Sequence, residues 1–326
     1  MANSFSLLPL PDRARLRVLR CMDGTTLFLF SLVSQKTKEM VRCLQLQPSD
    51  IVIWIQDDIC LAIDIRGFSD LHLTFSKENE QYMDMLKKPA NLWIRDADET
   101  NMKLSNSLEL KEWIKYLFYI YDCRREPAII FDEGCERFEY QAIKNTFGKL
   151  RSLEVLEGAT NESIDIMDCF LPDIDELDLA ANPFDPDDID FQKVLMGNFT
   201  FLNLGEEEFE SFTLNDLLVS NAPYIEHELP QDPVFLNRFL KLWMKGACPN
   251  LIRLCMNNPK MISESIFKGV NVLRRIPADE DIIFNGTVHG RGIRPERIAA
   301  EIGRFDGTRA TVYIAECCFF FHKWIF

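Results

Sequence analysis

Apolar residues at alternate positions recur at a nearly constant interval through the second half of the chain. The pairs lie at Leu153/Val155, Leu177/Leu179, Leu202/Leu204, His227/Leu229 and Leu254/Met256. Successive pairs are separated by 24, 25, 25 and 27 residues. Alternation over a few residues is typical of a strand with one buried face. A fixed period of this length predicts stacked strand–turn–helix units, because one such unit cannot bury its apolar face alone.

The clearest copy of the repeat is LPDIDELDLAANPF at 171–184, and PNLIRLCMNN at 249–258 is a second. Asn182 occupies the position at which leucine-rich repeats use an asparagine to satisfy backbone groups as the strand turns away. Helical stretches are expected between the strands, at 187–196, 212–220 and 234–244. The fold class is therefore α/β (α+β overall), with an irregular leucine-rich-repeat-like domain. The alternative is an ordinary α/β or α+β domain with coincidental spacing.

Residues 47–100 are predicted to form a β-rich connecting segment. The short β-branched runs 51–55, 59–65 and 71–75 indicate a β-meander. An amphipathic helix is expected over 108–121. Its apolar face would consist of Leu110, Trp113, Ile114, Leu117 and Phe118.

The C-terminal region predicts a closing hairpin. Residues 298–316 alternate on both sides of Asp306-Gly307, a dipeptide that favours hairpin turns. Three phenylalanines, 319–321, and Trp324 follow. We expect the hairpin to cap the last open edge of the stacked strands.

The N-terminus predicts three short helices in about 40 residues, a unit too small to be stable without a partner. Leu8-Pro9 and Leu10-Pro11 mark an extended entry. Asp12 can cap the first helix, Thr25 or Thr26 the second, and Ser34 the third. Such a unit usually leaves apolar surface for another protein. The alternative is a helical start to the larger domain.

The order and spacing of the apolar positions in residues 5–44 resemble the F-box. The matching features are Phe5, Leu8-Pro9, Leu16, Val18-Leu19, Met22, Leu27-Phe28-Leu29, Ser31-Leu32-Val33-Ser34 and the basic Lys36 and Lys38. The resemblance implies an F-box over 1–46 that binds the Skp-type adaptor of a cullin–RING ubiquitin ligase. The implied adaptor contacts are Leu8, Pro9, Leu16, Val18, Leu19, Leu27, Leu29 and Leu32. Asp12-Arg13 departs from the family, which often has a Glu after the Leu-Pro.

A second resemblance covers 101–326, which is similar to the F-box-associated domain of the expanded nematode F-box families. It depends on three segments: Ser211 to Leu218, Leu236 to Gly246, and Asp306 to Thr311 with the aromatic tail. Two adjoining family patterns in this order are more specific than either alone. The resemblance implies a substrate-recruiting subunit but names no substrate.

The charge is uneven along the chain. The net charge is −15, of which residues 1–44 contribute +4 and the remainder −19. A strongly acidic body argues against nucleic acid as a ligand, whereas a basic N-terminal region suits an acidic partner. A solvated helix face would show the same charge, so both interpretations stay open.

The apolar runs are too short to cross a membrane, and the N-terminus lacks the apolar stretch of a signal peptide. The ten cysteines are scattered, with no CxxC pair and no zinc-ligand spacing. We therefore expect a cytoplasmic or nuclear protein with reduced, mostly buried thiols. The adjacent Cys317 and Cys318 are not expected to form a redox pair, because neighbouring strand residues face opposite sides.

Sequence motifs of enzymes are missing. The chain has no GxxxxGK[ST], GxSxG or HExxH motif, and its four histidines are far apart in sequence. The acidic run at 185–190 lacks the Gly and terminal Glu of a calcium loop. The prediction is therefore a protein that is not an enzyme, with no catalytic residues, cofactor or metal.

The functional hypothesis is a substrate receptor of an SCF-type ubiquitin ligase, with an unknown target protein bound by the C-terminal domain. The alternative is an adaptor-independent interaction scaffold whose degenerate F-box no longer docks. An enzyme with an unrecognised site is a third, weaker hypothesis. Burial of the apolar positions of the first two helices would favour the scaffold.

Overall fold

The computed structural model describes residues 7, 9–65, 71–76, 86, 91–95, 101–105, 108–184, 189–207, 212–227, 232–257, 264–277, 282–284, 287–289, 298–315 and 318–325. The chain divides into two compact units, Met1–Ile174 and Asp175–Phe326, each described here by itself. The predicted division at residues 46 and 100 stays a prediction. Leu8, Cys317 and Leu229 lie outside the described residues, as do residues 185–188 of the acidic run.

Three short helices occupy the predicted N-terminal region: α1 (Asp12–Leu19), α2 (Gly24–Leu32) and α3 (Gln35–Arg42). Asp12 is the first residue of α1 and forms an ion pair with Arg15. It does not cap the helix, because Pro11 occupies the N-cap.

The cap of α2 also differs from the prediction. Asp23, not Thr25 or Thr26, is the N-cap, and its carboxylate accepts the backbone N–H of Thr26 at 2.7 Å. Ser34 caps α3 as predicted.

The sheet of the first unit begins with the predicted meander. Strands β1 (Pro48–Ile55), β2 (Ile59–Ile65) and β3 (Leu71–Ser76) pair antiparallel in order, and β4 (Asn91–Arg95) and β5 (Asn101–Ser105) extend them. On its other edge β1 pairs parallel with β6 (Ala128–Phe131), which pairs parallel with β7 (Ser152–Val155). The sheet is thus mixed, antiparallel on one side of β1 and parallel on the other.

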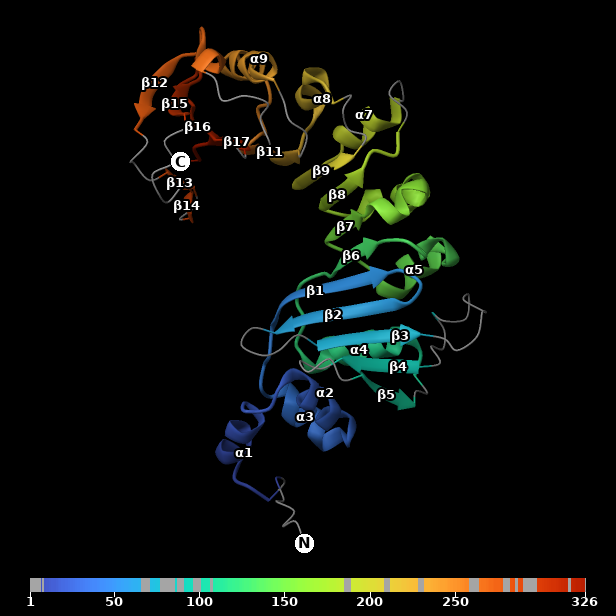
Figure 1. The fold of residues 1–326 in the computed structure, drawn as a ribbon. Coiled ribbons are helices and arrows are strands. Elements are labelled where there is room, and N and C mark those ends of the chain that lie inside the picture. The colour runs from blue at the N-terminus through green and yellow to red at the C-terminus, as the bar shows by residue number, and fades with distance from the viewer. Residues whose placement is uncertain are drawn as a thin grey trace. The chain divides into compact units, whose positions relative to one another are not determined.

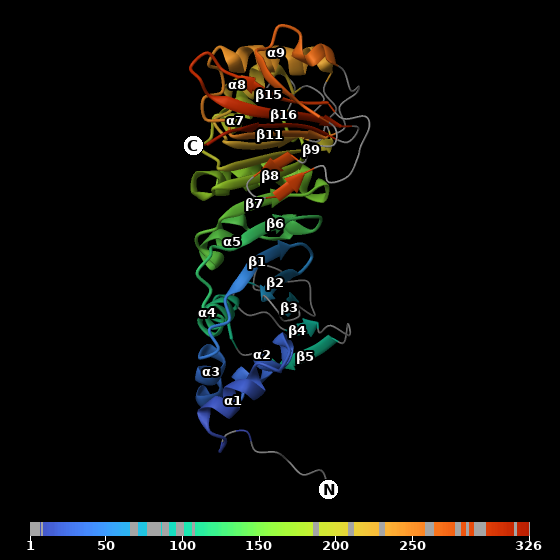
Figure 2. The same ribbon diagram turned by 90° about the vertical axis from the view of Figure 1, so that its left-hand side faces the viewer.

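Helices cover one face of this sheet. They are α4 (Leu110–Ile120), α5 (Tyr140–Phe147) and α6 (Ser163–Phe170). Leu110, Trp113, Ile114 and Leu117 of α4 are buried as predicted, whereas Phe118 is half-buried. In both views α4 lies next to α2 and α3 (Figures 1 and 2).

The second unit contains four parallel strands at the predicted repeat. They are β8 (Glu176–Ala181), β9 (Phe201–Glu207), β10 (Tyr224–His227) and β11 (Arg253–Asn257). Leu177, Leu202, Ile225 and Leu254 stand in register and are buried. The predicted pair His227/Leu229 is wrong by two residues, because Ile225 and His227 occupy the equivalent positions.

Between these strands run α7 (Ile189–Leu195), α8 (Leu214–Val219) and α9 (Pro233–Met244). The three helices lie on one side of the strands (Figure 1). Phe239 of α9 lies 5.3 Å from the ring of Phe321, and Trp243 lies 5.1 Å from it. The apolar core of the unit is therefore between these helices and the sheet.

The closing hairpin is present. Strands β15 (Ile298–Gly303) and β16 (Arg309–Ala315) pair antiparallel around Asp306-Gly307, where Gly307 has a φ of +91°. However, neither strand meets β11. That place is taken by a third strand, β17 (Cys318–Lys323), and β12 (Val272–Ile276) pairs with the outer edge of β15. A separate pair, β13 (Ile282–Phe284) and β14 (Thr287–His289), completes the strands described.

The structure is thus of mixed α/β class, as predicted. The expectation of mostly buried thiols is wrong for the nine cysteines that the structure describes. Only Cys135 and Cys248 are buried, and Cys21 and Cys43 are exposed. None of those nine cysteines forms a disulfide bond. Burial raises the pKa of the Cys248 thiol to about 11, which keeps this thiol protonated and unreactive at neutral pH.

Candidate functional site: an apolar surface on the N-terminal helices

Helix α2 is apolar around almost its whole circumference. Its sequence is GTTLFLFSL, without a charged residue. A helix that is hydrophobic all round is normally buried on every side. In this structure α2 is buried on one side alone, which makes its other side the first candidate for a binding surface.

The inner face of α2 packs against α4. Gly24, Leu27, Phe28 and Ser31 are buried, and their spacing of three and four residues places them on one helix face. The Phe28 ring lies 5.9 Å from that of Trp113. This face therefore serves stability, and it fixes α2 to the first unit.

Polar contacts also join α4 to α2 and α3. The Tyr116 hydroxyl is hydrogen-bonded to the Ser31 hydroxyl at 2.9 Å, and the Tyr119 hydroxyl donates to the Glu39 carboxylate at 2.7 Å. The Lys38 ammonium lies 4.3 Å from the Tyr116 ring centre, and the Arg42 guanidinium lies 4.0 Å from that of Tyr119. Burial raises the pKa of the Tyr116 hydroxyl, so it stays protonated at neutral pH. Lys38 and Arg42, two of the N-terminal positive charges, thus contact aromatic rings within the first unit.

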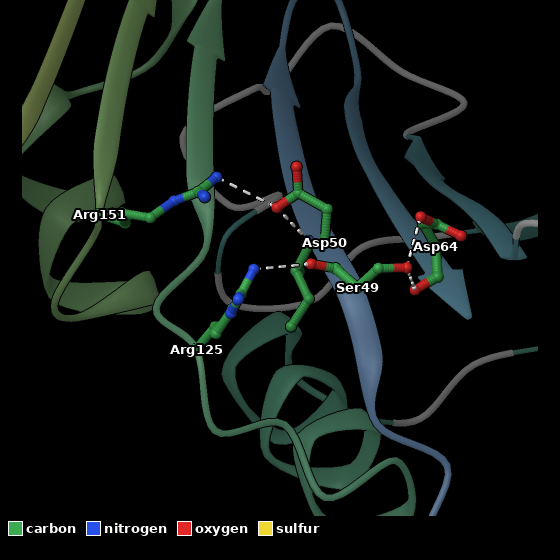
Figure 3. Close-up of polar contacts among 6 residues, drawn as sticks. Ser49, Asp50, Asp64, Arg125 and Arg151 are labelled. Atoms are coloured by element: carbon green, nitrogen blue, oxygen red, sulfur yellow. Dashed lines mark hydrogen bonds and ion pairs between the residues drawn. The ribbon is translucent and has the colours of Figure 1, made fainter. Parts of the chain in front are cut away.

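The chain leaves α3 directly into β1, and a polar cluster holds the start of that strand (Figure 3). The Ser49 hydroxyl donates to Asp64 of β2 at 2.6 Å, and Arg125 donates to the Ser49 carbonyl oxygen at 3.3 Å. Arg151, just before β7, pairs with Asp50 at 3.1 Å. The start of β1 is therefore held from both sides, by Asp64 of β2 on one side and by Arg125 and Arg151 on the other.

The outer face of α2 remains accessible. Leu29 and Leu32 are half-buried, and Val33, at the C-cap, is 74% exposed. These positions are three and four residues apart and share one face. In α1, Leu16 and Val18 are half-buried, and Pro9 before it is exposed. We refer to Pro9, Leu16, Val18, Leu29, Leu32 and Val33 as the N-terminal apolar surface.

Two of the predicted adaptor contacts do not lie on this surface. Leu19 and Leu27 are 0% exposed. A side chain with no accessible area cannot touch a partner in this conformation, so these two leucines support the helices from inside. Val33 is the accessible residue that sequence reasoning missed; its helical spacing from Leu29 was the signal that could have found it.

Exposed positive charge accompanies α1. Arg13, Arg17 and Arg20 are exposed and recur at helical spacing, so they share a face of the helix. Arg15, by contrast, is engaged by Asp12. The exposed arginines suit an acidic partner.

The segments that carried the second resemblance are mostly core. In α9, Leu236, Phe239, Leu240 and Trp243 are buried. The Asn237 side chain donates to the backbone oxygens of residues 266 and 268, at 2.6 and 3.0 Å. These residues determine the fold, so the pattern does not indicate which surface binds a partner.

Comparison with known proteins bears on the same region. Residues 190–256, which include α8, β10, α9 and β11, match the model of the F-box associated family. The chain is also 22% identical over 318 residues to the F-box associated domain-containing protein sdz-33 of Caenorhabditis elegans, covering 94% of this chain and 93% of that protein. Both matches support a resemblance of this chain to nematode proteins that carry an F-box-associated domain. No solved structure matches the chain at a significant level.

Two features are absent from the part of the chain that the structure describes. No group of His, Cys, Asp or Glu among those residues is arranged to hold a metal ion. No helix in the described ranges is long and apolar enough to cross a membrane. The N-terminal apolar surface therefore remains the first candidate for function.

Proposed function

We propose that this chain is a substrate-recruiting subunit of a cullin–RING (SCF-type) ubiquitin ligase. Its N-terminal helices bind the Skp-type adaptor, and its C-terminal domain binds a target protein. The chain contributes no catalytic group in this proposal; it accelerates ubiquitin transfer by holding the target close to the conjugating enzyme. Such a complex acts in the cytoplasm or nucleus.

The observation that carries the proposal is the unequal burial of α2. One face is packed on α4 through Phe28, whereas on the opposite face Leu29 and Leu32 are half-buried and Val33 is 74% exposed. Exposed apolar residues grouped on one helix face indicate a protein-binding surface. The F-box resemblance and the F-box-associated domain give that surface its expected partner, the adaptor.

The alternative, an adaptor-independent scaffold, predicts that these apolar positions are covered by the body of the protein. The burial of Leu19 and Leu27 fits that alternative. Leu29 and Leu32 are only half-buried and Val33 is exposed, which fits the receptor.

A single substitution on the surface tests the proposal. Val33→Asp places a charge among apolar residues that a partner would desolvate, and we expect it to weaken adaptor binding at least about tenfold, since about 1.4 kcal/mol corresponds to a factor of ten. The measurement is biolayer interferometry with purified Skp-type adaptor and the full chain.

Val234→Asp is the matched control, because Val234 is 56% exposed on α9 in the other unit. It should bind the adaptor as the wild type does. A Leu8→Ala/Pro9→Ala variant tests the entry segment in the same assay. Unchanged affinity in both Val33→Asp and Leu8→Ala/Pro9→Ala would contradict the proposal.

A further inference from the structure

The face of the second sheet opposite its helices differs from the core face. In β8, in β10 and in β9 as far as Leu204, every second residue is buried toward α7–α9, and the residues between them are half-buried. Those intervening residues include Glu176 and Asp178 of β8, Phe201 of β9, and Tyr224 and Glu226 of β10. No helix covers this side of the strands in the described part of the unit (Figure 1).

The register arranges these residues in two rows across the strands. Glu176, Phe201 and Tyr224 form one row, and Asp178, Asn203 and Glu226 form the other. Adjacent strands are about 4.8 Å apart, so each row is a continuous line of neighbours. A shallow hollow of about 400 Å³ lies at the first row, lined by Glu176, Thr200, Phe201 and Tyr224.

The two carboxylates of the second row have different partners, a neutral amide for Asp178 and a guanidinium for Glu226. Both Asp178 oxygens accept from the single amide nitrogen of Asn203, at 3.0 and 3.1 Å. The Glu226 carboxylate pairs with Arg253 at 2.9 Å. Burial and the nearby Glu226 charge raise the pKa of Asp178. A cation placed between Asp178 and Glu226 would relieve this repulsion.

Beyond β10, at β11 and the C-terminal strands, the same face of the sheet becomes apolar. The guanidinium of Arg253 lies 4.8 Å from the Phe320 ring centre. Phe320 packs with Ala299, Tyr313 and Ala315 in a buried cluster. The accessible part of this face is therefore the acidic and aromatic part on β8–β10.

We propose that the helix-free face of β8–β10 binds an extended segment of a protein partner through its lysine or arginine side chains. Asp178 and Glu226 receive the cations, and the rings of Phe201 and Tyr224 pack against the aliphatic stems. Rings of this kind also attract cations over their faces. This inference rests on the proposed function in one respect: it takes the bound partner to be the recruited target protein.

Charge complementarity is the reason for choosing a basic protein segment. The chain outside residues 1–44 has a net charge of −19, so a cationic segment is attracted over a distance as well as at contact. Side chains of an extended segment alternate between its two faces. Every second residue of such a segment would therefore reach the rows.

The test uses a defined probe, a fluorescein-labelled peptide of Lys-Thr repeats about ten residues long, which exceeds the width of three strands. Fluorescence anisotropy with the full chain measures Kd at about 0.15 M ionic strength, where charges more than about 8 Å apart are screened. We expect binding of the Lys-Thr peptide and none of a Glu-Thr peptide of equal length.

The double variant Asp178→Asn/Glu226→Gln should weaken binding of the Lys-Thr peptide about tenfold. Asp178→Asn alone keeps the size of the side chain and should give a Kd between those of the wild type and the double variant. A graded loss of this kind distinguishes loss of the site from a folding defect. The matched control is Glu133→Gln/Glu157→Gln, which removes two exposed carboxylates from the first unit and should leave Kd unchanged.

Equal weakening in the double variant and the control would overturn the proposal, because binding would then follow net charge alone. Absence of binding to the wild type would overturn it as well. The peptide assay contains no adaptor, so its failure is distinguishable from failure of the proposed adaptor docking.

Discussion

Replacing Phe28 by alanine removes the ring that joins α2 to α4. Phe28 is 0% exposed and meets the rings of Trp113 and Tyr116, at 5.9 and 6.5 Å. A buried aromatic ring removes roughly 150–250 Å² from water, worth about 4–6 kcal/mol at ~25 cal/mol/Å². The alanine methyl group retains part of this, and the unfolded chain is partly compact. Phe→Ala substitutions in cores accordingly cost about 3–5 kcal/mol.

We expect Phe28→Ala to lower the free energy of unfolding of the first unit, Met1–Ile174, by that amount. For a unit of this size each kcal/mol shifts Tm by about 2–4 °C, so Tm should fall by roughly 6–20 °C. Differential scanning calorimetry gives Tm. Hydrogen exchange of α4 peptides separates the first unit from the second, since the two can unfold independently.

The control is the same substitution at an exposed position. Phe305 is 75% exposed in the turn between β15 and β16, so Phe305→Ala should change stability by less than about 0.5 kcal/mol. If Phe28→Ala cost less than about 1 kcal/mol and left α4 protected, the packing of α2 on α4 would be refuted, and with it the idea that α2 has one inner and one outer face.

Two further predictions concern the interior of each unit. Gly134 has a φ of +93°, and a Cβ there would lie 2.7 Å from the Asp57 backbone nitrogen, whereas Gly246 has a φ of +106° and open space around it. Urea denaturation should therefore show a clearly larger loss of stability for Gly134→Ala than for Gly246→Ala, which should cost about 1 kcal/mol. Equal losses in the two variants would contradict this prediction. Burial lowers the pKa of His227 from 6.5 to about 4. Because the pKa of His227 is lower in the folded state than in the unfolded state, the neutral, buried imidazole contributes to folding stability. This contribution is fully present above pH 6.5 and is lost as pH falls toward 4, in total about 3 kcal/mol. His227→Leu should remove that part of the pH dependence of the urea midpoint, and an identical pH profile for variant and wild type would disprove it.

Much of the strand layout could be predicted because alternation is a local property. Residues 51–55, 59–65 and 71–75 alternate between core and solvent, and they became β1–β3. The Asp306-Gly307 hairpin was predictable for the same reason: the left-handed φ of Gly307 is a local requirement of the turn.

Non-local and directional features could not be predicted. Pairing of β17 with β11 joins residues more than sixty positions apart, and no local pattern selects it over β15. The fourth repeat was misplaced by two residues because a step of 25 residues from Leu202 leads to His227, whereas the strand partner of Leu202 is Ile225. A shift of two residues keeps every side chain on the same face, so alternation alone does not reveal the error.

The N-terminal surface shows the same limit. A helix with apolar residues around most of its circumference does not reveal from its sequence which face is buried. The pattern therefore could not separate Leu27, which is fully buried, from Leu29, which is half-buried. Likewise Asp23, Thr25 and Thr26 are all good capping residues, and only the backbone geometry selects Asp23.

The two apolar faces of α2 have a mechanical consequence for a receptor. A partner bound at Leu29, Leu32 and Val33 is separated from α4 only by the thickness of one helix, about 10 Å. Because Phe28 and the Tyr116–Ser31 hydrogen bond fix the inner face, the partner's position is transmitted to the first unit without a flexible joint at α2. Stability and partner binding are then separable properties of one helix. Under the proposed function, changes on the inner face should alter both properties, because they disturb the packing that presents the outer face. Changes on the outer face should alter binding alone.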